Sequence, residues 1–192
     1  MVKNIVLCGV GGQGILLAAK IIARAAGTAG FQVAANEIHG MAQRGGSVTA
    51  QIRYGENFFS PLVAEGGVDL LGAMEAGEAL RYAHWLNPHG FAVVSALKII
   101  PVTVSSGKAS YPADVETRLK RVFPQLFFRD FAADSTKLGT PKLANTVMLG
   151  AISARLDEIP AATWRDAVAG CVKPAYVDLN LKAFEIGRKS AL

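Results

Sequence analysis

Cysteine is scarce in this chain of 192 residues, which contains only Cys8 and Cys171. Two thiols so far apart in the sequence indicate neither a disulfide scaffold nor a metal site. A single iron–sulfur cluster usually takes about four thiolate ligands. We therefore expect no metal site here, and the chain cannot hold such a cluster by itself.

Long hydrophobic runs are absent as well. No stretch of roughly 18 apolar residues is available to span a membrane, and glycine ends the apolar run from Ile5 to Cys8, unlike the core of a signal peptide. Basic residues do not interleave with aromatic ones, and the group at Arg118–Arg121 has the spacing of a solvated helix face. We expect a cytoplasmic protein that binds neither membrane nor nucleic acid.

Charged residues are also few, at 18%, whereas hydrophobic residues make up 51% of the chain. The length fits one domain, residues 1–192. So apolar a composition fits either an Ala- and Gly-rich core or a surface that meets another subunit, and we expect a homo-oligomer when the chain is isolated. The net charge of +5 suits anionic ligands or an acidic partner.

The N-terminal region reads as a strand at Asn4–Cys8, a glycine turn, a helix at Ile15–Ala29 and a second strand at Phe31–Ala35. This βαβ-like unit predicts a single α/β domain with a doubly wound, mostly parallel sheet and a Rossmann-like glycine turn. A loop is expected at Asn36–Gly46 and a turn at Asn87–Gly90. The other predicted strands are Ser47–Tyr54, Val68–Ala73, Phe91–Ser95, Ile99–Val104 and Leu126–Phe131, and the other helices are Glu75–Leu86, Pro112–Phe123, Pro141–Leu156, Ala161–Cys171 and Ala175–Lys189.

The first candidate site is the glycine turn. Its residues fit the pattern G-x-G-x-x-G between a strand and a helix, and they are Gly9, Gly11, Gly12, Gln13 and Gly14. Glycines permit the tight turn and the close approach of a ligand, while the helix N-terminus offers free N–H groups to a phosphate. The pattern favours an anion site, although a turn that needs glycine only for packing would look the same.

A dinucleotide site would also need an acidic residue about 20 positions further on. Asn36 occupies that place and Glu37 follows it, so Glu37 could bind a ribose hydroxyl. An independent NAD- or FAD-binding oxidoreductase is therefore the alternative function. The chain is too short to add a substrate half with residues for hydride transfer.

The second candidate site is the polar segment that follows, with Gln43, Arg44, Gly45, Gly46 and Ser47. An arginine beside paired glycines is a good receptor for a phosphate or a carboxylate. A structural or interfacial loop, in which Arg44 pairs with a carboxylate of a partner, explains the segment equally well.

Two further residues are weaker candidates. His39 has a side chain that can transfer a proton near neutral pH, although a structural hydrogen bond is the commoner role. Asn145 lies one turn inside the helix that begins near Pro141. It could face a ligand crevice at the strand ends, but helix capping or a hydrogen bond in the core accounts for it as well.

These motifs together resemble a known family. The segments GVGGQGI and EIHGMAQRGGSV resemble the gamma-type domain of pyruvate and other 2-oxoacid:ferredoxin oxidoreductases, and the second has the form found in the beta subunits of the indolepyruvate type. SPLVAEGGVDLLGAMEAGEALRY, LGTPKLANTVMLGA and NLKAFEIG extend the resemblance over Val2 to Gly187.

The resemblance implies an assembly that decarboxylates a 2-oxoacid, passes electrons to ferredoxin and forms an acyl-CoA. It also implies a large alpha subunit that carries thiamine diphosphate and the iron–sulfur clusters, with CoA as co-substrate. This chain has no Gly-Asp-Gly segment typical of thiamine diphosphate sites and no cysteine cluster. We therefore expect it to bind no cofactor alone and to be inactive when isolated.

Overall fold

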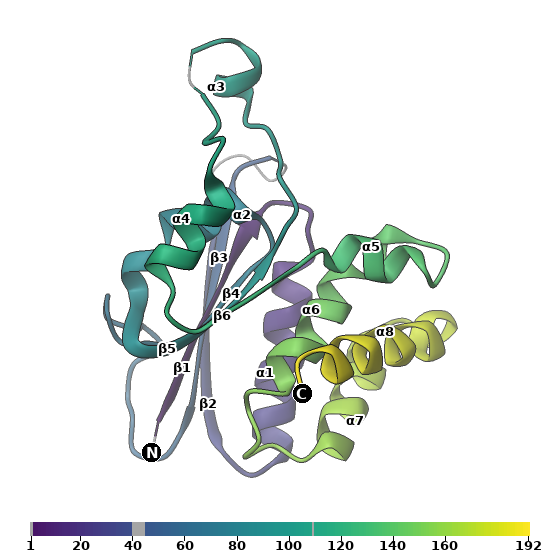
Figure 1. Ribbon diagram of the computed structural model, residues 1–192. Coiled ribbons are helices and arrows are strands. Elements are labelled where there is room, and N and C mark those ends of the chain that lie inside the picture. Colours follow the sequence, from purple (N-terminus) through teal and green to yellow (C-terminus); the bar gives the residue numbers. More distant parts are fainter. Residues whose placement is uncertain (1, 40–44, 109) are drawn as a thin grey trace.

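The computed structural model describes residues 2–39, 45–108 and 110–192. Its centre is a six-stranded sheet with the order β2-β3-β1-β4-β5-β6 (Figure 1). The strands are β1 (Lys3–Val10), β2 (Gln32–His39), β3 (Ser47–Gly55), β4 (Val68–Ala73), β5 (Leu86–Ser95) and β6 (Leu126–Arg129).

The sheet is mostly parallel, as predicted. β1, β4, β5 and β6 pair in parallel, one with the next. β3 pairs antiparallel with both β1 and β2, so β2 runs in the same direction as β1 without touching it. The unit of strand, helix and strand at the N-terminus therefore does not join neighbouring strands, because β3 lies between them.

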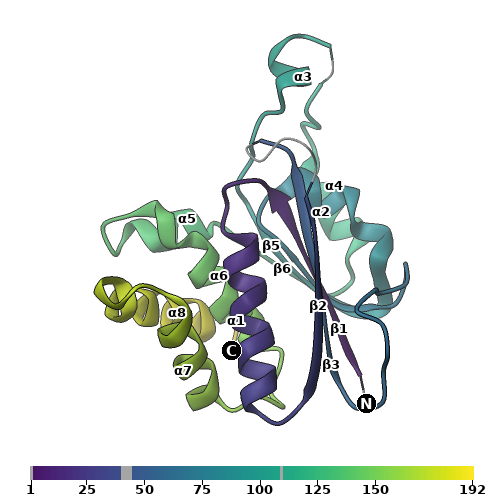
Figure 2. The ribbon, with the colours of Figure 1, turned by 180° about the vertical axis from the view of Figure 1, so that it is seen from behind.

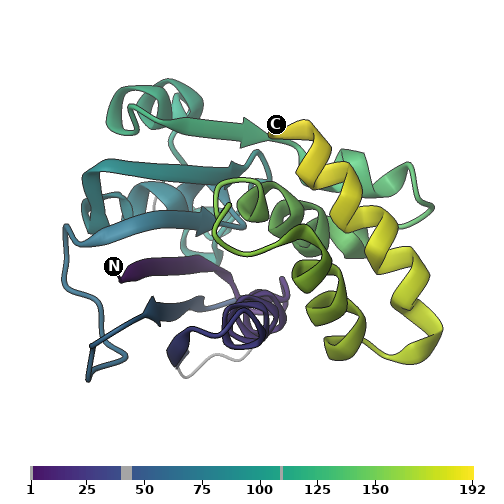
Figure 3. The ribbon, with the colours of Figure 1, turned by 90° about the horizontal axis from the view of Figure 1, so that it is seen from below.

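Helices cover both faces of the sheet, which confirms the doubly wound α/β class (Figures 2 and 3). Side chains of β1 alternate, so that Ile5 and Leu7 join one core cluster while Val6 and Cys8 join the other. The first face packs against α1 (Ile15–Thr28), α6 (Ala144–Ser153), α7 (Ala161–Cys171) and α8 (Val177–Ser190). The second packs against α2 (Ala76–Arg81) and α4 (Val115–Val122).

Two loop predictions were wrong because strands extend further than expected. Asn36–His39 was assigned to a loop, but β2 continues to His39, with Asn36 opposite Gln51 and His39 opposite Val48 of β3. Polar residues are tolerated there because β2 is an edge strand with one side open to solvent. The predicted turn at Asn87–Gly90 lies within β5.

The strand predicted at Ile99–Val104 was also wrong. A short helix, α3 (Val102–Ser105), occupies part of it. Apolar, β-branched residues favour a strand, but β5 already has β4 on one side and β6 on the other, so no place beside β5 is free for them. After β6 the chain forms α5 (Phe131–Thr136), where no helix was predicted.

Short 3-10 turns complete the chain. They are η1 (Ala83–Trp85), η2 (Pro141–Leu143) and η3 (Pro174–Tyr176). Within the part of the chain that the structure describes, no helix is both long enough and apolar enough to cross a membrane.

Candidate functional site

The arrangement of α1 and α2 creates a crevice at the carboxyl ends of two neighbouring strands. β1 and β4 are parallel neighbours, yet the helix that follows β1 lies on one face of the sheet and the helix that follows β4 lies on the other. The chain therefore diverges between these two strands, which is where open α/β sheets bind their ligands.

The crevice has a volume of about 490 Å³. Its walls come from the residues that follow β1, β4, β5 and β6 and from the start of α6. The lining residues are Gly12, Gln13, Met74, Ser95, Leu97, Phe131, Ala132, Pro141, Lys142, Ala144 and Asn145. The predicted glycine turn and the predicted Asn145 thus lie in one cavity.

The glycine turn adopts a conformation that favours glycine at two positions. Gly12 has a φ of 99° and Gly14 a φ of 82°, both in the left-handed region that costs other residues free energy. Gly14 precedes α1, which has no side-chain cap and no acidic residue in its first turn. The first N–H groups of such a helix lack intrahelical partners and carry partial positive charge, so this end of α1 suits an anion.

The Gln13 amide holds the turn in place. The Val10 N–H donates to Gln13 Oε1 at 2.6 Å, and Gln13 Nε2 donates to the carbonyl oxygen of Met74 at 2.9 Å. A Cβ on Gly9 would lie 2.6 Å from the same Gln13 oxygen, which explains the glycine there. Gln13 therefore joins the turn to the end of β4, and its oxygen is already occupied.

Asn145 contributes a donor to the crevice. Its side chain is only 9% exposed, and a Cβ on Gly14 would clash with its Nδ2 atom. The side-chain oxygen of Asn145, Oδ1, accepts a long hydrogen bond of 3.4 Å from Thr146 Oγ1. Nδ2 has no hydrogen-bond partner among the described residues, although it faces the N-terminal end of α1.

Lys142 is the one charged residue among the described residues that line the crevice. It lies in η2, where its N–H donates to Thr140 Oγ1 at 3.3 Å. The sequence does not indicate this position as a site residue, because a lone lysine beside a proline is typical of many solvated helix starts. A cation and the N-terminal ends of α1 and α6 therefore border one cavity, and all three favour a negatively charged ligand.

The backbone of Ser47 pairs with Val10 beside the glycine turn, but its side chain points away from the crevice. The Gly11 N–H donates to the carbonyl oxygen of Gly46 at 2.8 Å, which ties the two predicted segments together. Ser47, one residue further, points to the opposite face and donates to Glu78 Oε2 at 2.5 Å. This hydroxyl is already bound to a buried carboxylate, and a carboxylate repels anions.

The other residues of that segment are only partly described. Gly45 is exposed, with a φ of 78°. Gln43 and Arg44 lie outside the described residues, and so does the side chain of His39.

Glu37 lies away from the crevice. It lines a shallow, mostly apolar groove between α1 and β2 together with Leu16 and Ala35. Because β3 separates β2 from β1, the acidic residue is one strand further from the glycine turn than in a dinucleotide site with adjacent strands.

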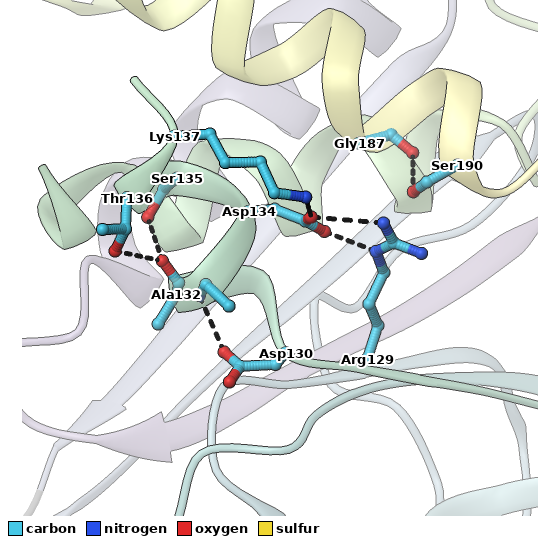
Figure 4. Close-up of polar contacts among 10 residues, drawn as sticks. Arg129, Asp130, Ala132, Asp134, Ser135, Thr136, Lys137, Gly187 and Ser190 are labelled. Atoms are coloured by element: carbon cyan, nitrogen blue, oxygen red, sulfur yellow. Dashed lines mark hydrogen bonds and ion pairs between the residues drawn. The ribbon is translucent and has the colours of Figure 1, made fainter. Parts of the chain in front are cut away.

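An ion-pair network supports the α5 wall of the crevice (Figure 4). Arg129, at the end of β6, makes two hydrogen bonds to the carboxylate of Asp134, and Lys137 Nζ makes a third at 2.8 Å. The Arg129 guanidinium, followed by the Lys137 ammonium, holds the pKa of Asp134 below its usual range. The network fixes the turn that carries Phe131 and Ala132.

The cysteines lie apart from the crevice. Cys8 is buried, which raises the pKa of its thiol, and Cys171 is half-buried in α7. In residues 2–39, 45–108 and 110–192, no group of three or more His, Cys, Asp or Glu side chains could hold a metal ion.

These features define an open α/β protein with an anion-suited crevice at its switch point, and comparison with known proteins identifies its family. Residues 4–190 match the Pyruvate ferredoxin/flavodoxin oxidoreductase family, and the chain belongs to it.

Two relatives are similar over almost the whole chain. The chain is 40% identical, over 192 residues, to the "Indolepyruvate oxidoreductase subunit IorB" of Archaeoglobus fulgidus and 40% identical, over 194 residues, to the protein of the same name in Pyrococcus horikoshii. Each match covers 98% of this chain and 95% of the relative.

A solved structure shares the fold. The gamma subunit of a keto/oxoacid ferredoxin oxidoreductase from Geobacter sulfurreducens superposes with a TM-score of 0.74 at 25% identity, covering 100% of this chain and 97% of that one.

Proposed function

We propose that the chain is the small subunit of a 2-oxoacid:ferredoxin oxidoreductase of the indolepyruvate or arylpyruvate type. The observation that carries the proposal is the 40% identity, over 98% of the chain, to proteins named as indolepyruvate oxidoreductase subunits. The assembled enzyme would decarboxylate the 2-oxoacid oxidatively in the cytoplasm, form an acyl-CoA and pass the electrons to ferredoxin.

The cofactors belong to a larger partner subunit in this proposal. An iron–sulfur cluster does not fit this chain, because Cys8 is buried against α2 and Cys171 lies in another helix. Thiamine diphosphate and the clusters would therefore be carried by the large alpha subunit, through which ferredoxin receives the electrons. This chain contributes part of the wall of the shared site.

The crevice would hold the phosphate groups of CoA. The N–H groups at Gly12 and Gly14 and the amide of Asn145 would donate to phosphate oxygens, and Lys142 would add a positive charge. Gln43 and Arg44 would complete the site from the neighbouring loop, and His39 would be the candidate for proton transfer. The remaining predicted residues would support the conformation of the turn without binding the ligand; they are Gly9, Gly11, Gln13, Gly45, Gly46 and Ser47.

The alternative, an independent NAD- or FAD-dependent oxidoreductase, needs Glu37 beside the glycine turn. The position of β3 between β1 and β2 disfavours it. Melting curves of the pure chain with NAD(H) separate the two functions, because a ligand that binds the folded state raises the melting temperature. We expect no shift with NAD(H), and a clear shift would favour the alternative.

The isolated chain provides a second test. It should reduce no dye in the presence of arylpyruvate and CoA, because it lacks the thiamine diphosphate on which decarboxylation depends. Arylpyruvate-dependent dye reduction by the pure, metal-free chain would refute the division of labour between the two subunits.

A further inference from the structure

Residues 96–108 and 110–113 leave the end of β5, extend beyond the sheet and return to the start of α4. We call this segment the arm. Figure 1 shows α3 at its tip, clear of the rest of the molecule. Among the described side chains of the arm, none is buried. An excursion of this length without a core of its own is uncommon in a compact domain and usually has a function.

The arm exposes apolar side chains that its own body does not cover. Ile100 is 53% exposed and Leu97 is 36% exposed. Surface loops are ordinarily polar, whereas residues 97–104 include Leu97, Ile99, Ile100, Val102 and Val104. Covering exposed aliphatic side chains with the surface of another protein lowers the free energy, because apolar area is removed from water.

The charge of the arm has one sign. Lys98 and Lys108 are both exposed, and residues 96–113 contain no Asp or Glu. A surface that receives the arm is therefore expected to be acidic at its rim.

The root of the arm is fixed by one buried carboxylate. Glu75 is 3% exposed, and its Oε1 atom accepts hydrogen bonds from the Ile99 N–H at 3.2 Å and from the Tyr111 hydroxyl at 2.6 Å. Ile99 lies on the outgoing part of the arm and Tyr111 on the returning part. A single side chain thus holds both parts together.

The same carboxylate fixes the arm to the body. Glu75 Oε2 caps α2 by accepting from the Glu78 N–H at 2.8 Å, and the Ala76 N–H donates to the carbonyl oxygen of Leu97 at 3.0 Å. Burial, followed by the hydrogen bond to Glu75, raises the pKa of Tyr111, so the Tyr111 hydroxyl stays a donor. A protrusion held this firmly at its root loses less conformational entropy when it docks.

The arm starts at the candidate site. Leu97 belongs to the arm and also lines the crevice. A surface that covers the root of the arm therefore also closes one side of the crevice.

We propose that the arm is a docking element that inserts its apolar residues into an acidic-rimmed, apolar recess of the large subunit and so places that subunit over the crevice. The inference rests on the proposed function, which supplies the second subunit. The arm of a second copy is a poorer occupant, because Lys98 and Lys108 of the two arms would repel one another and residues 96–113 contain no acidic residue to pair with them.

The test compares two matched substitutions in the chain co-expressed with a tagged large subunit. Ile100→Asp places a charge on the arm. Leu62→Asp makes the same kind of change at a residue that is 57% exposed, in the loop that follows β3 at the opposite end of the sheet. We expect Ile100→Asp to raise the dissociation constant of the two subunits at least about tenfold, and Leu62→Asp to leave it within about twofold.

Charge reversal provides a second readout. Lys98→Glu combined with Lys108→Glu should slow association and make it less sensitive to salt, because exposed charges act mainly on encounter rates. Both sets of variants should keep the melting temperature of the isolated chain, since the altered side chains are exposed.

Each outcome has one meaning. Wild-type affinity for the large subunit in Ile100→Asp would overturn the docking role of the arm. A drop in the oligomeric mass of the isolated chain in Ile100→Asp would also overturn it, since the arm would then contact a second copy. Failure of the wild-type chain itself to bind the large subunit would instead refute the proposed function.

Discussion

The side-chain nitrogen of Asn145 lies so close to Gly14 that no Cβ can be added to Gly14 without a clash. Gly14 ends the turn before α1, and Asn145 lies in the first turn of α6. The two helices that border the crevice therefore pack closely at this contact, and Asn145 explains why residue 14 is glycine.

Replacing Gly14 should destabilise the chain for two separable reasons. Gly14→Ala forces alanine into a left-handed conformation and displaces Asn145, and we expect a loss of roughly 1–3 kcal/mol in the free energy of unfolding. Gly30→Ala is the matched control, since Gly30 has a φ of 92° and no atom within 4 Å of an added Cβ.

Denaturant unfolding measures both variants. The difference between them reports the contact with Asn145, and it should shrink when both are made in an Asn145→Ala background. Equal losses in Gly14→Ala and Gly30→Ala would show that the contact contributes nothing.

Asn145 should matter to the ligand of the assembled enzyme. Asn145→Ala removes one neutral donor, worth about 0.5–1.5 kcal/mol, so the apparent KM for CoA should rise about two- to tenfold. Asn145→Asp should raise it further, because a carboxylate repels phosphate. Steady-state kinetics at varied CoA decides the point, and an unchanged KM in both variants would remove Asn145 from the site.

Lys142 should act through its charge. Lys142→Gln is expected to raise the apparent KM for CoA most strongly at low ionic strength, because salt screens a cation at the edge of a cavity. Lys173→Gln serves as the control, because Lys173 is also exposed but lies outside the crevice. The same salt response in both variants would attribute the effect to net charge alone.

The acid sensitivity of the fold should depend on Asp134. The pKa of Asp134 is lowered in the folded state, first by Arg129 and then by Lys137. The ionised carboxylate therefore contributes its full share to the free energy of unfolding above the unfolded pKa of about 3.9. This contribution is lost as the pH falls through the folded pKa.

Asp134→Asn should therefore lower the free energy of unfolding by about 1–3 kcal/mol near neutral pH, with a smaller difference in acid. Asp114→Asn breaks an exposed pair with Arg118 and should change stability little. Urea unfolding between pH 2 and pH 7 tests both, and a constant difference for Asp134→Asn across that range would contradict the assignment.

Self-association of the isolated chain should use the open edge of the sheet. β2 is an uncovered edge strand with Ile38 half exposed, and the apolar groove at Leu16 and Ala35 lies beside it. We expect a dimer, because such edges readily pair. Light scattering at micromolar concentration checks this, and Ile38→Lys should shift the mass toward the monomer. A monomeric wild-type chain would contradict the prediction.

The sequence predicted the parts of the fold that depend on local pattern. The strand, glycine turn and helix around Gly11 and Gly14 follow from hydrophobic periodicity and from the backbone freedom of glycine. A position of Asn145 at the ligand crevice was one of the roles considered for it from the sequence. Residues that depend on distant partners were not predictable in the same way. The insertion of β3 between β1 and β2 turned Ser47 to the other face, where it bonds to Glu78.

The arm and Lys142 show the same limit. Residues 99–104 have strand propensity, but both sides of β5 are filled, so the segment leaves the sheet. Lys142 joins the site only because α6 packs beside the glycine turn, and neither its neighbours in sequence nor its residue type indicates this.

The most direct measurement of the central claim is an add-back titration. The large subunit, purified alone with its cofactors, is mixed with increasing amounts of this chain, and ferredoxin reduction is followed with indolepyruvate and CoA. The account predicts almost no turnover by either subunit alone and a rise to a plateau as the chain is added, with arylpyruvates preferred over pyruvate. Full activity of the large subunit without the chain, or no activity at any ratio of the two, would contradict it.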